Sequence, residues 1–81
     1  MNIPTPVSLD QFQAGRHAVV RQVRGGQELV NRCASMGLTA GAQLLVLQNT
    51  GHGPMLVSVR DTRIALGRGE AAKILVEALA P

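Results

Sequence analysis

The chain contains 81 residues, of which 46% are hydrophobic and 16% are charged, and its formal net charge is +3. A chain of this length forms one domain and buries only about 60 to 65% of its unfolded surface, so its core is small. Phe12 is the one aromatic residue, which argues against the aromatic platforms that bind single-stranded nucleic acids or proline-rich peptides.

The composition indicates a soluble cytoplasmic protein. A single cysteine cannot form the internal disulfides of small secreted domains. The first six residues lack the basic and apolar regions of a signal peptide, and no apolar run approaches the roughly 20 residues that span a bilayer. The basic residues are spread along the chain, and this mild bias fits an ordinary solvated surface best. It also suits an acidic partner or a position near the negative cytoplasmic leaflet, so that any contact with the membrane is indirect.

The first predicted element is a short N-terminal helical turn, which follows a proline-containing tail at residues 1–6. Ser8 and Gln11 have the spacing of a capping box, while Val7 and Phe12 occupy the positions of a hydrophobic staple. We expect this turn to end at Gly15.

A strand is predicted over residues 16–24 because Ala18 and Val20 alternate with the residues between them. Val23 breaks this alternation, which indicates a bulge or the end of the strand. The glycine pair at 25–26 then ends the element.

The next segment is predicted to be an amphipathic helix that ends at Met36. Leu29, Cys33 and Met36 recur at helical spacing and form one buried stripe. Gly37 is the first residue after the helix end, a position that often takes a positive φ. Leu38 follows at the position that contacts Cys33 in a Schellman cap.

Four further strands are predicted in the second half of the chain. Beyond Gly41, residues 43–48 are apolar on both faces, and alternation places Leu44 and Val46 in the core. A loop at 49–54, a tight turn at 60–62 and a helical turn at 67–71 separate the remaining strands. Those strands are predicted from the alternating residues Met55, Val57 and Val59, then Ile64 and Leu66, and finally Ile74, Val76 and Ala78.

Five short strands with one helix after the first favour a mainly β fold. We expect a small, partly open SH3-like antiparallel barrel with an inserted α-helix and a short N-terminal helical turn, formed as a single domain by residues 7–81. The inward side chains of so small a barrel fill its interior, so any function lies on its outer surface.

The order and spacing of several residues resemble the FeoA family, the small cytoplasmic component of bacterial ferrous iron uptake. The matching positions are Leu9, Gly15, Arg32, Met36-Gly37-Leu38, Gly41, Pro54, Ala65-Leu66, Glu70-Ala71 and the stretch 74–76. The chain departs from the family pattern at Cys33, where the family usually has leucine, and at Ala40, where it often has proline.

This resemblance implies an SH3-like domain that acts without catalysis, by binding the cytosolic part of FeoB, a membrane transporter with a G-protein domain. It also implies a role in iron homeostasis. The same domain resembles the C-terminal module of iron-dependent repressors, and a stand-alone relative of that module is an alternative.

The residues themselves give little support for an enzyme or for a bound cofactor. The five carboxylates are scattered, and the serines lack a nucleophile elbow. The glycine pairs at 51–53 and 67–69 lack the lysine and hydroxyl residue that end a P-loop. We therefore expect neither catalysis nor a cofactor.

A dedicated metal site is not predicted. His17 and His52 lie on separate elements, Cys33 belongs to the buried stripe, and no pair of ligands has the short spacing of a structural zinc site. Two molecules could share a zinc ion through exposed histidine and carboxylate groups, which we interpret as adventitious transition-metal binding.

Binding of RNA or DNA is a second function class, because small barrels often bind RNA and Arg16, Arg21 and Arg24 lie on one predicted strand. Alternation places Arg21 on the face opposite the other two, unless a bulge intervenes. The missing aromatic residues lower this expectation further.

Protein binding fits the sequence best. Alternation places Leu45 and Leu47 on the outer face of the sheet, beside Leu56 from the next strand. Either the helix covers these leucines, or they form an apolar surface for another protein or a second copy of the chain. Arg21 and Arg32 mark an alternative interface.

Overall fold

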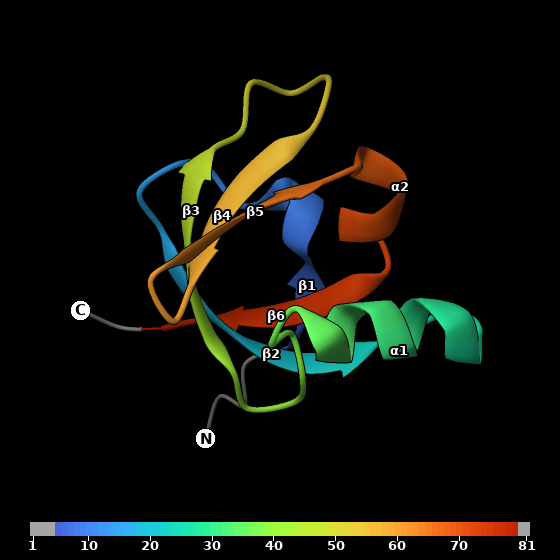
Figure 1. Ribbon diagram of the computed structural model, residues 1–81. Helices are drawn as coiled ribbons and strands as arrows, with labels where there is room; N and C mark the ends of the chain where they lie inside the picture. The colour runs from blue at the N-terminus through green and yellow to red at the C-terminus, as the bar shows by residue number, and fades with distance from the viewer. Residues whose placement is uncertain (1–4, 80–81) are drawn as a thin grey trace.

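The computed structural model describes residues 5–79 (Figure 1). Most of the predicted tail at 1–6 and the last two residues of the predicted domain, 80–81, lie outside the described residues. The elements in chain order are β1 (Val7–Ser8), the 3₁₀ helix η1 (Leu9–Gln11), β2 (His17–Val23), α1 (Gln27–Ser35), β3 (Gln43–Gln48), β4 (Met55–Val59), β5 (Thr62–Leu66), α2 (Arg68–Ala71) and β6 (Ile74–Ala78).

The strands form one antiparallel sheet in the order β1-β6-β2-β3-β4-β5. This confirms the predicted mainly β class, with six strands rather than about five. The additional strand, β1, is only two residues long, too short for an alternation of apolar residues to be visible in the sequence. The sheet wraps around a single core and leaves β1 and β5 as its two edges (Figure 1).

Alternating side chains of the strands fill this core. Leu44 and Val46 of β3 are buried, as predicted, and so are Met55, Val57 and Val59 of β4. In β6, Ile74 and Val76 are buried, whereas Ala78 at the end of the strand is exposed. The alternation of β2 groups Val19 with the exposed residues His17 and Arg21, but its side chain is only 9% exposed; its cross-strand neighbours on that face are Gln43 and Glu77.

Helix α1 ends in a Schellman motif. Gly37 has a φ of 86°, and its N–H donates to the Ala34 carbonyl at 3.0 Å. The N–H of Leu38 donates to the Cys33 carbonyl at 2.8 Å, and both of these side chains are buried. These two bonds satisfy helix-end carbonyls, which explains why the helix stops where the glycine occurs.

The N-terminal turn differs from the prediction in its cap. The Ser8 side chain makes no bond to the backbone of η1; its hydroxyl accepts a bond from the Gln11 side chain at 3.1 Å. A single 3₁₀ turn does not bring the N3 backbone to the cap residue as an α-helix does. Val7 belongs to strand β1 and is 38% exposed, so it does not form the predicted hydrophobic staple.

Two irregular features refine the predicted strands. The register of β2 against β6 shifts between Val20 and Gln22, which confirms a bulge near the point where alternation fails. The β4–β5 turn consists of Arg60 and Asp61, both with positive φ (52° and 64°), so Thr62 already belongs to β5. Such a two-residue turn matches the twist of the flanking strands.

Both helices of the described segment are short, and neither has the length and apolar character needed to cross a membrane.

Candidate partner-binding surface

The three predicted outer leucines lie together on strands β3 and β4. Leu45 is the cross-strand neighbour of Ser58, and Leu56 pairs with Gln48, so both leucines occupy the face opposite the core. Leu47 lies at a register shift between Val46 and Gln48. All three side chains are half-buried. We call Leu45, Leu47 and Leu56 the leucine surface.

Helix α1 lies over another part of the sheet. It contacts β2 and is drawn beside β2 and β6, away from the β3–β4 ribbon (Figure 1). Its apolar stripe of Leu29, Cys33 and Met36 packs against the core. Within residues 5–79, Val7 is the one large apolar side chain exposed by more than a third, although its spacing from Phe12 predicts a hydrophobic staple.

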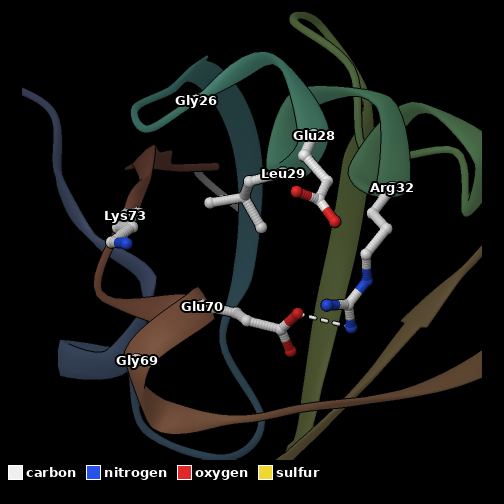
Figure 2. A pocket seen from close by; sticks show the side chains of 7 residues that line it. All are labelled: Gly26, Glu28, Leu29, Arg32, Gly69, Glu70 and Lys73. Carbon is white, nitrogen blue, oxygen red and sulfur yellow. Dashed lines mark ion pairs between the residues drawn. The ribbon is translucent and has the colours of Figure 1, made fainter.

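A shallow groove of about 290 Å³ separates α1 from α2 (Figure 2). Leu29 forms its apolar wall, Gly26 and Gly69 form its rims, and Lys73 contributes a cation. Glu28 and Arg32 project into it from α1, and Glu70 projects from α2. Opposite charges therefore face each other across the groove.

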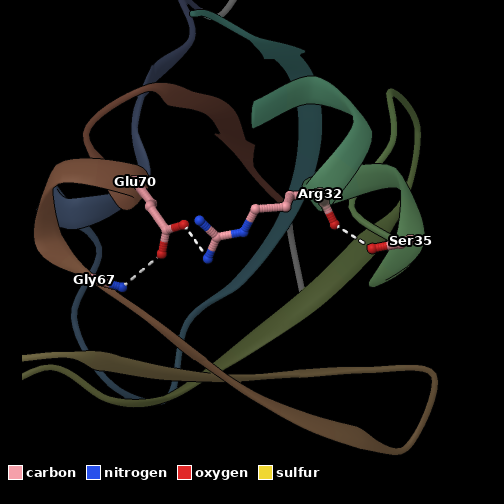
Figure 3. A network of polar contacts seen from close by, with 4 residues as sticks. All are labelled: Arg32, Ser35, Gly67 and Glu70. Atoms are coloured by element: carbon pink, nitrogen blue, oxygen red, sulfur yellow. Dashed lines mark hydrogen bonds and ion pairs between the residues drawn. The ribbon is translucent and has the colours of Figure 1, made fainter. Parts of the chain in front are cut away.

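Glu70 is held in place by two contacts (Figure 3). Its Oε1 atom accepts a bond from the N–H of Gly67 at 3.1 Å, and its Oε2 atom forms an ion pair with Arg32. The first contact is half of a capping box, since Gly67 has no side chain to return the bond. On the α1 side, the Arg32 carbonyl accepts a bond from the Ser35 hydroxyl at 2.7 Å.

Cys33, the residue after Arg32 on α1, is fully buried. Burial raises the pKa of its thiol, the nearby Glu70 carboxylate raises it further, and the Arg32 guanidinium opposes both effects. A buried thiol with a raised pKa is a poor nucleophile and a poor metal ligand, because both roles require the thiolate.

The predicted basic residues do not form one stripe. Arg21 is paired with Glu77 of β6 at 3.1 Å, whereas Arg32 faces the α1–α2 groove, so the structure separates these two candidates. The guanidinium of Arg16 lies over the Phe12 ring, 4.9 Å from its centroid, so this face of the ring is already covered by a cation. The β2 bulge lies between Arg16 and Arg24, so simple alternation does not relate their directions.

The two histidines are on different segments. His17 is exposed on β2 opposite Leu45, and His52 is exposed in the loop after β3. In the described part of the chain, no three side chains among His, Cys, Asp and Glu are arranged to hold a metal ion.

A polar network that the sequence analysis missed centres on Asn49. Its amide donates to the carbonyls of Asp10 and Phe12 at 3.0 and 2.8 Å, and its Oδ1 accepts from Arg68 at 2.8 Å. Arg68 also donates to the Asp10 carbonyl at 3.1 Å. The only local signal was an asparagine two residues before Gly51, typical of an Asx-turn, and that bond is present at 3.2 Å. The long-range partners carry no sequence signal.

Comparisons with known proteins match this architecture. The family model described as FeoA domain matches residues 7–78. A protein provisionally named Fe(2+) transport protein A, from Methanocaldococcus jannaschii, is 38% identical over 63 residues, which cover 78% of this chain and 76% of that protein.

Solved structures give the same result. A crystal structure described as the iron uptake regulatory protein FeoA superposes with a TM-score of 0.87 at 35% identity, over 93% of this chain and 100% of that one. A manganese-dependent transcriptional repressor shares the fold at a TM-score of 0.83 and 22% identity; the match covers 98% of this chain but only 45% of the repressor.

Proposed function

Since the chain belongs to the FeoA domain family, we propose that it is a non-enzymatic adaptor that binds the cytosolic part of a FeoB-like ferrous iron transporter and regulates it from the cytoplasmic side. The observation that carries this proposal is the leucine surface, a group of half-buried apolar side chains on the outside of a barrel whose interior is filled. Apolar side chains that lie together on an outer face are characteristic of protein interfaces.

The arrangement of charged groups supports binding over catalysis. The carboxylates of Glu70 and Glu77 are engaged by arginines, and the single thiol is buried. A general base or nucleophile needs a free, accessible group beside a pocket. In the described residues, the groove between α1 and α2 is shallow and its charges are partly paired.

A pull-down from purified components tests the proposal. The full chain is immobilised and incubated with the isolated cytosolic domains of a FeoB-like transporter at 0.15 M salt, with an unrelated G-protein domain of similar charge as the control. Specific retention of the transporter domains is expected. Absence of retention in both the nucleotide-free and the GTP-bound states would contradict the proposal.

Retention of RNA in the same assay examines the alternative class. Nucleic-acid binding that depends on phosphate contacts weakens steeply between 0.05 and 0.2 M salt. With Arg21 already paired with Glu77 and Phe12 covered by Arg16, we expect no RNA to be retained at 0.15 M salt. RNA retention without transporter retention would favour the nucleic-acid alternative.

A further inference from the structure

Strand β5 is an edge of the sheet whose outer side is free. It pairs with β4 alone, and within residues 5–79 no other segment is hydrogen-bonded to it as a strand. The other edge, β1, has only two residues, whereas β5 has five. An unpaired edge of this length presents a row of backbone donors and acceptors to another chain.

The hairpin register identifies the free groups. Because the turn contains two residues, Val59 and Thr62 form a hydrogen-bonded pair, and the bonded pairs then recur at Ile64 and Leu66. The backbone groups of the intervening residues, Arg63 and Ala65, therefore point away from β4. Within the described residues, neither is hydrogen-bonded to the backbone of a turn or loop.

The side chains along this edge define what can pair with it. Thr62, Arg63 and Ala65 are exposed, so no described segment covers the edge, while Ile64 and Leu66 face the core. Within residues 5–79, neither Arg63 nor the neighbouring Arg60 takes part in an ion pair. The turn also exposes Asp61, but Arg63 is the charged residue of β5 itself, so an added strand would meet its positive charge on the outward side and apolar side chains on the inward side.

We propose that β5 accepts an extended acidic segment of a partner protein as a seventh strand, with its backbone bonded to Arg63 and Ala65 and an acidic side chain beside Arg63. Main-chain bonds of this kind supply affinity, and alternate side chains supply specificity. Charge complementarity favours an acidic segment over a second copy of this chain, whose net charge is +3.

This edge continues the leucine surface. Leu56 is the cross-strand neighbour of Ala65, and Ser58 is the neighbour of Arg63. A strand added at β5 would therefore lie beside the leucine surface, and both could contact one partner. The inference deepens the proposed function, on which it rests for the identity of that partner, but a synthetic peptide tests it separately from the transporter.

Amide hydrogen exchange followed by NMR gives the first test. In the free chain, the amides of Arg63 and Ala65 should exchange faster than those of Thr62, Ile64 and Leu66. Addition of the peptide Glu-Val-Glu-Val-Glu should protect the amides of Arg63 and Ala65, whereas Lys-Val-Lys-Val-Lys should not. Equal protection by both peptides, or by neither, would overturn the proposal. Protection that rises with protein concentration alone would also overturn it, because a second copy would then be the occupant.

Two variants complete the test. Ala65→Pro removes an outward N–H without removing a bond to β4, so it should abolish peptide binding. Arg63→Glu leaves the backbone donors and acceptors of β5 intact, so it tests the proposal even if the proline variant does not fold. It should lower the affinity for the acidic peptide by about threefold to fivefold and raise the affinity for the basic peptide. If the Arg63→Glu variant still preferred the acidic peptide over the basic one, the proposed contact between Arg63 and an acidic side chain would be wrong. If these variants lost peptide binding but still retained the transporter domains, the proposed function would stand and β5 would not be the site that binds the transporter.

Discussion

Arg32 of α1 and Glu70 of α2 form an ion pair with 2.5 Å between Nη2 and Oε2, while the other oxygen of Glu70 accepts a bond from the Gly67 backbone. The Glu70 carboxylate therefore links α2 to α1, through two residues that are 38 positions apart in the sequence. It also caps the first turn of α2. The Glu70 side chain is 22% exposed and that of Arg32 is 63% exposed, so solvent weakens the pair.

Substitution of Glu70 separates its two contacts. Glu70→Gln keeps an oxygen for the Gly67 N–H and removes the charge, so it should lower the free energy of unfolding by less than about 1 kcal/mol. Glu70→Ala loses both contacts and should lower it by about 1 to 2 kcal/mol. Urea unfolding measures both values. The difference between wild type and Glu70→Gln should shrink in 1 M NaCl, and a difference that persists there would exclude an electrostatic origin.

The buried thiol of Cys33 predicts a loss of stability at high pH. Its pKa is raised by burial and by Glu70, so the folded chain holds the proton more tightly than the unfolded chain does. The associated stability is present below the ordinary cysteine pKa of about 8.5 and is lost as pH rises through the higher folded pKa. Stability of wild type and Cys33→Ala should therefore converge as the pH rises above about 8.5. Parallel profiles would contradict the raised pKa.

The same residue predicts slow chemical modification. Cys33 should react slowly with a water-soluble thiol reagent in the native chain and rapidly in denaturant, because it has no exposed surface. Mass spectrometry at successive times measures the two rates. Rapid labelling of the native chain would place the thiol at the surface and restore it as a candidate ligand.

Gly37→Val should destabilise the domain because Gly37 has a φ of 86° and its added Cβ would lie 3.4 Å from Val59. We expect a loss of about 2 kcal/mol, or a fall of roughly 10 °C in melting temperature for a domain of this size. Gly37→Asn is the matched variant, since asparagine tolerates positive φ better, and it should lose less. An unchanged melting temperature in the valine variant would show that the helix end adapts at no cost.

Asn49 should be the most sensitive polar residue. Asn49→Ala removes four hydrogen bonds from a partly buried network and should lower the free energy of unfolding by about 2 to 3 kcal/mol. Asn49→Asp keeps the acceptor for Arg68 but cannot donate to the carbonyls of Asp10 and Phe12, so we expect a similar loss. Chemical denaturation measures both variants. Full stability in Asn49→Asp would assign the effect to Arg68 alone.

The leucine surface predicts a loss of binding without a loss of fold. Leu45→Glu with Leu56→Glu should abolish retention of the transporter domains while the circular dichroism spectrum and cooperative melting remain. The matched control is Gln22→Glu with Gln27→Glu, which adds the same charge at exposed positions of β2 and α1, away from the leucine surface. An unfolded leucine variant would mean that these side chains are covered, and a folded variant that still binds would place the interface elsewhere, such as at Arg21 or Arg32.

Several elements were predictable because their signals are local. The end of α1 depends on Gly37 and Leu38 alone, since a Schellman cap is formed within six residues. The alternating core residues of β3 and β4 follow from the period of a strand, which assigns each side chain to one face. The resemblance to the FeoA family rests on the same local features, repeated in order along the chain.

Other features depend on contacts between distant segments, and no local pattern encodes them. The two-residue strand β1 exists because β6 pairs with it, and Val19 lies between its cross-strand neighbours Gln43 and Glu77. The partners of Asn49 and Glu70 are 37 and 38 positions away, counted to Phe12 and to Arg32. By itself the sequence determined the fold class, the helix end and the family, since propensity, period and capping act over a few residues. Only the tertiary structure decided which strand edge is free, which charges are paired and whether α1 covers the outer leucines, because hydrogen-bond register and burial arise when the whole sheet closes around its core.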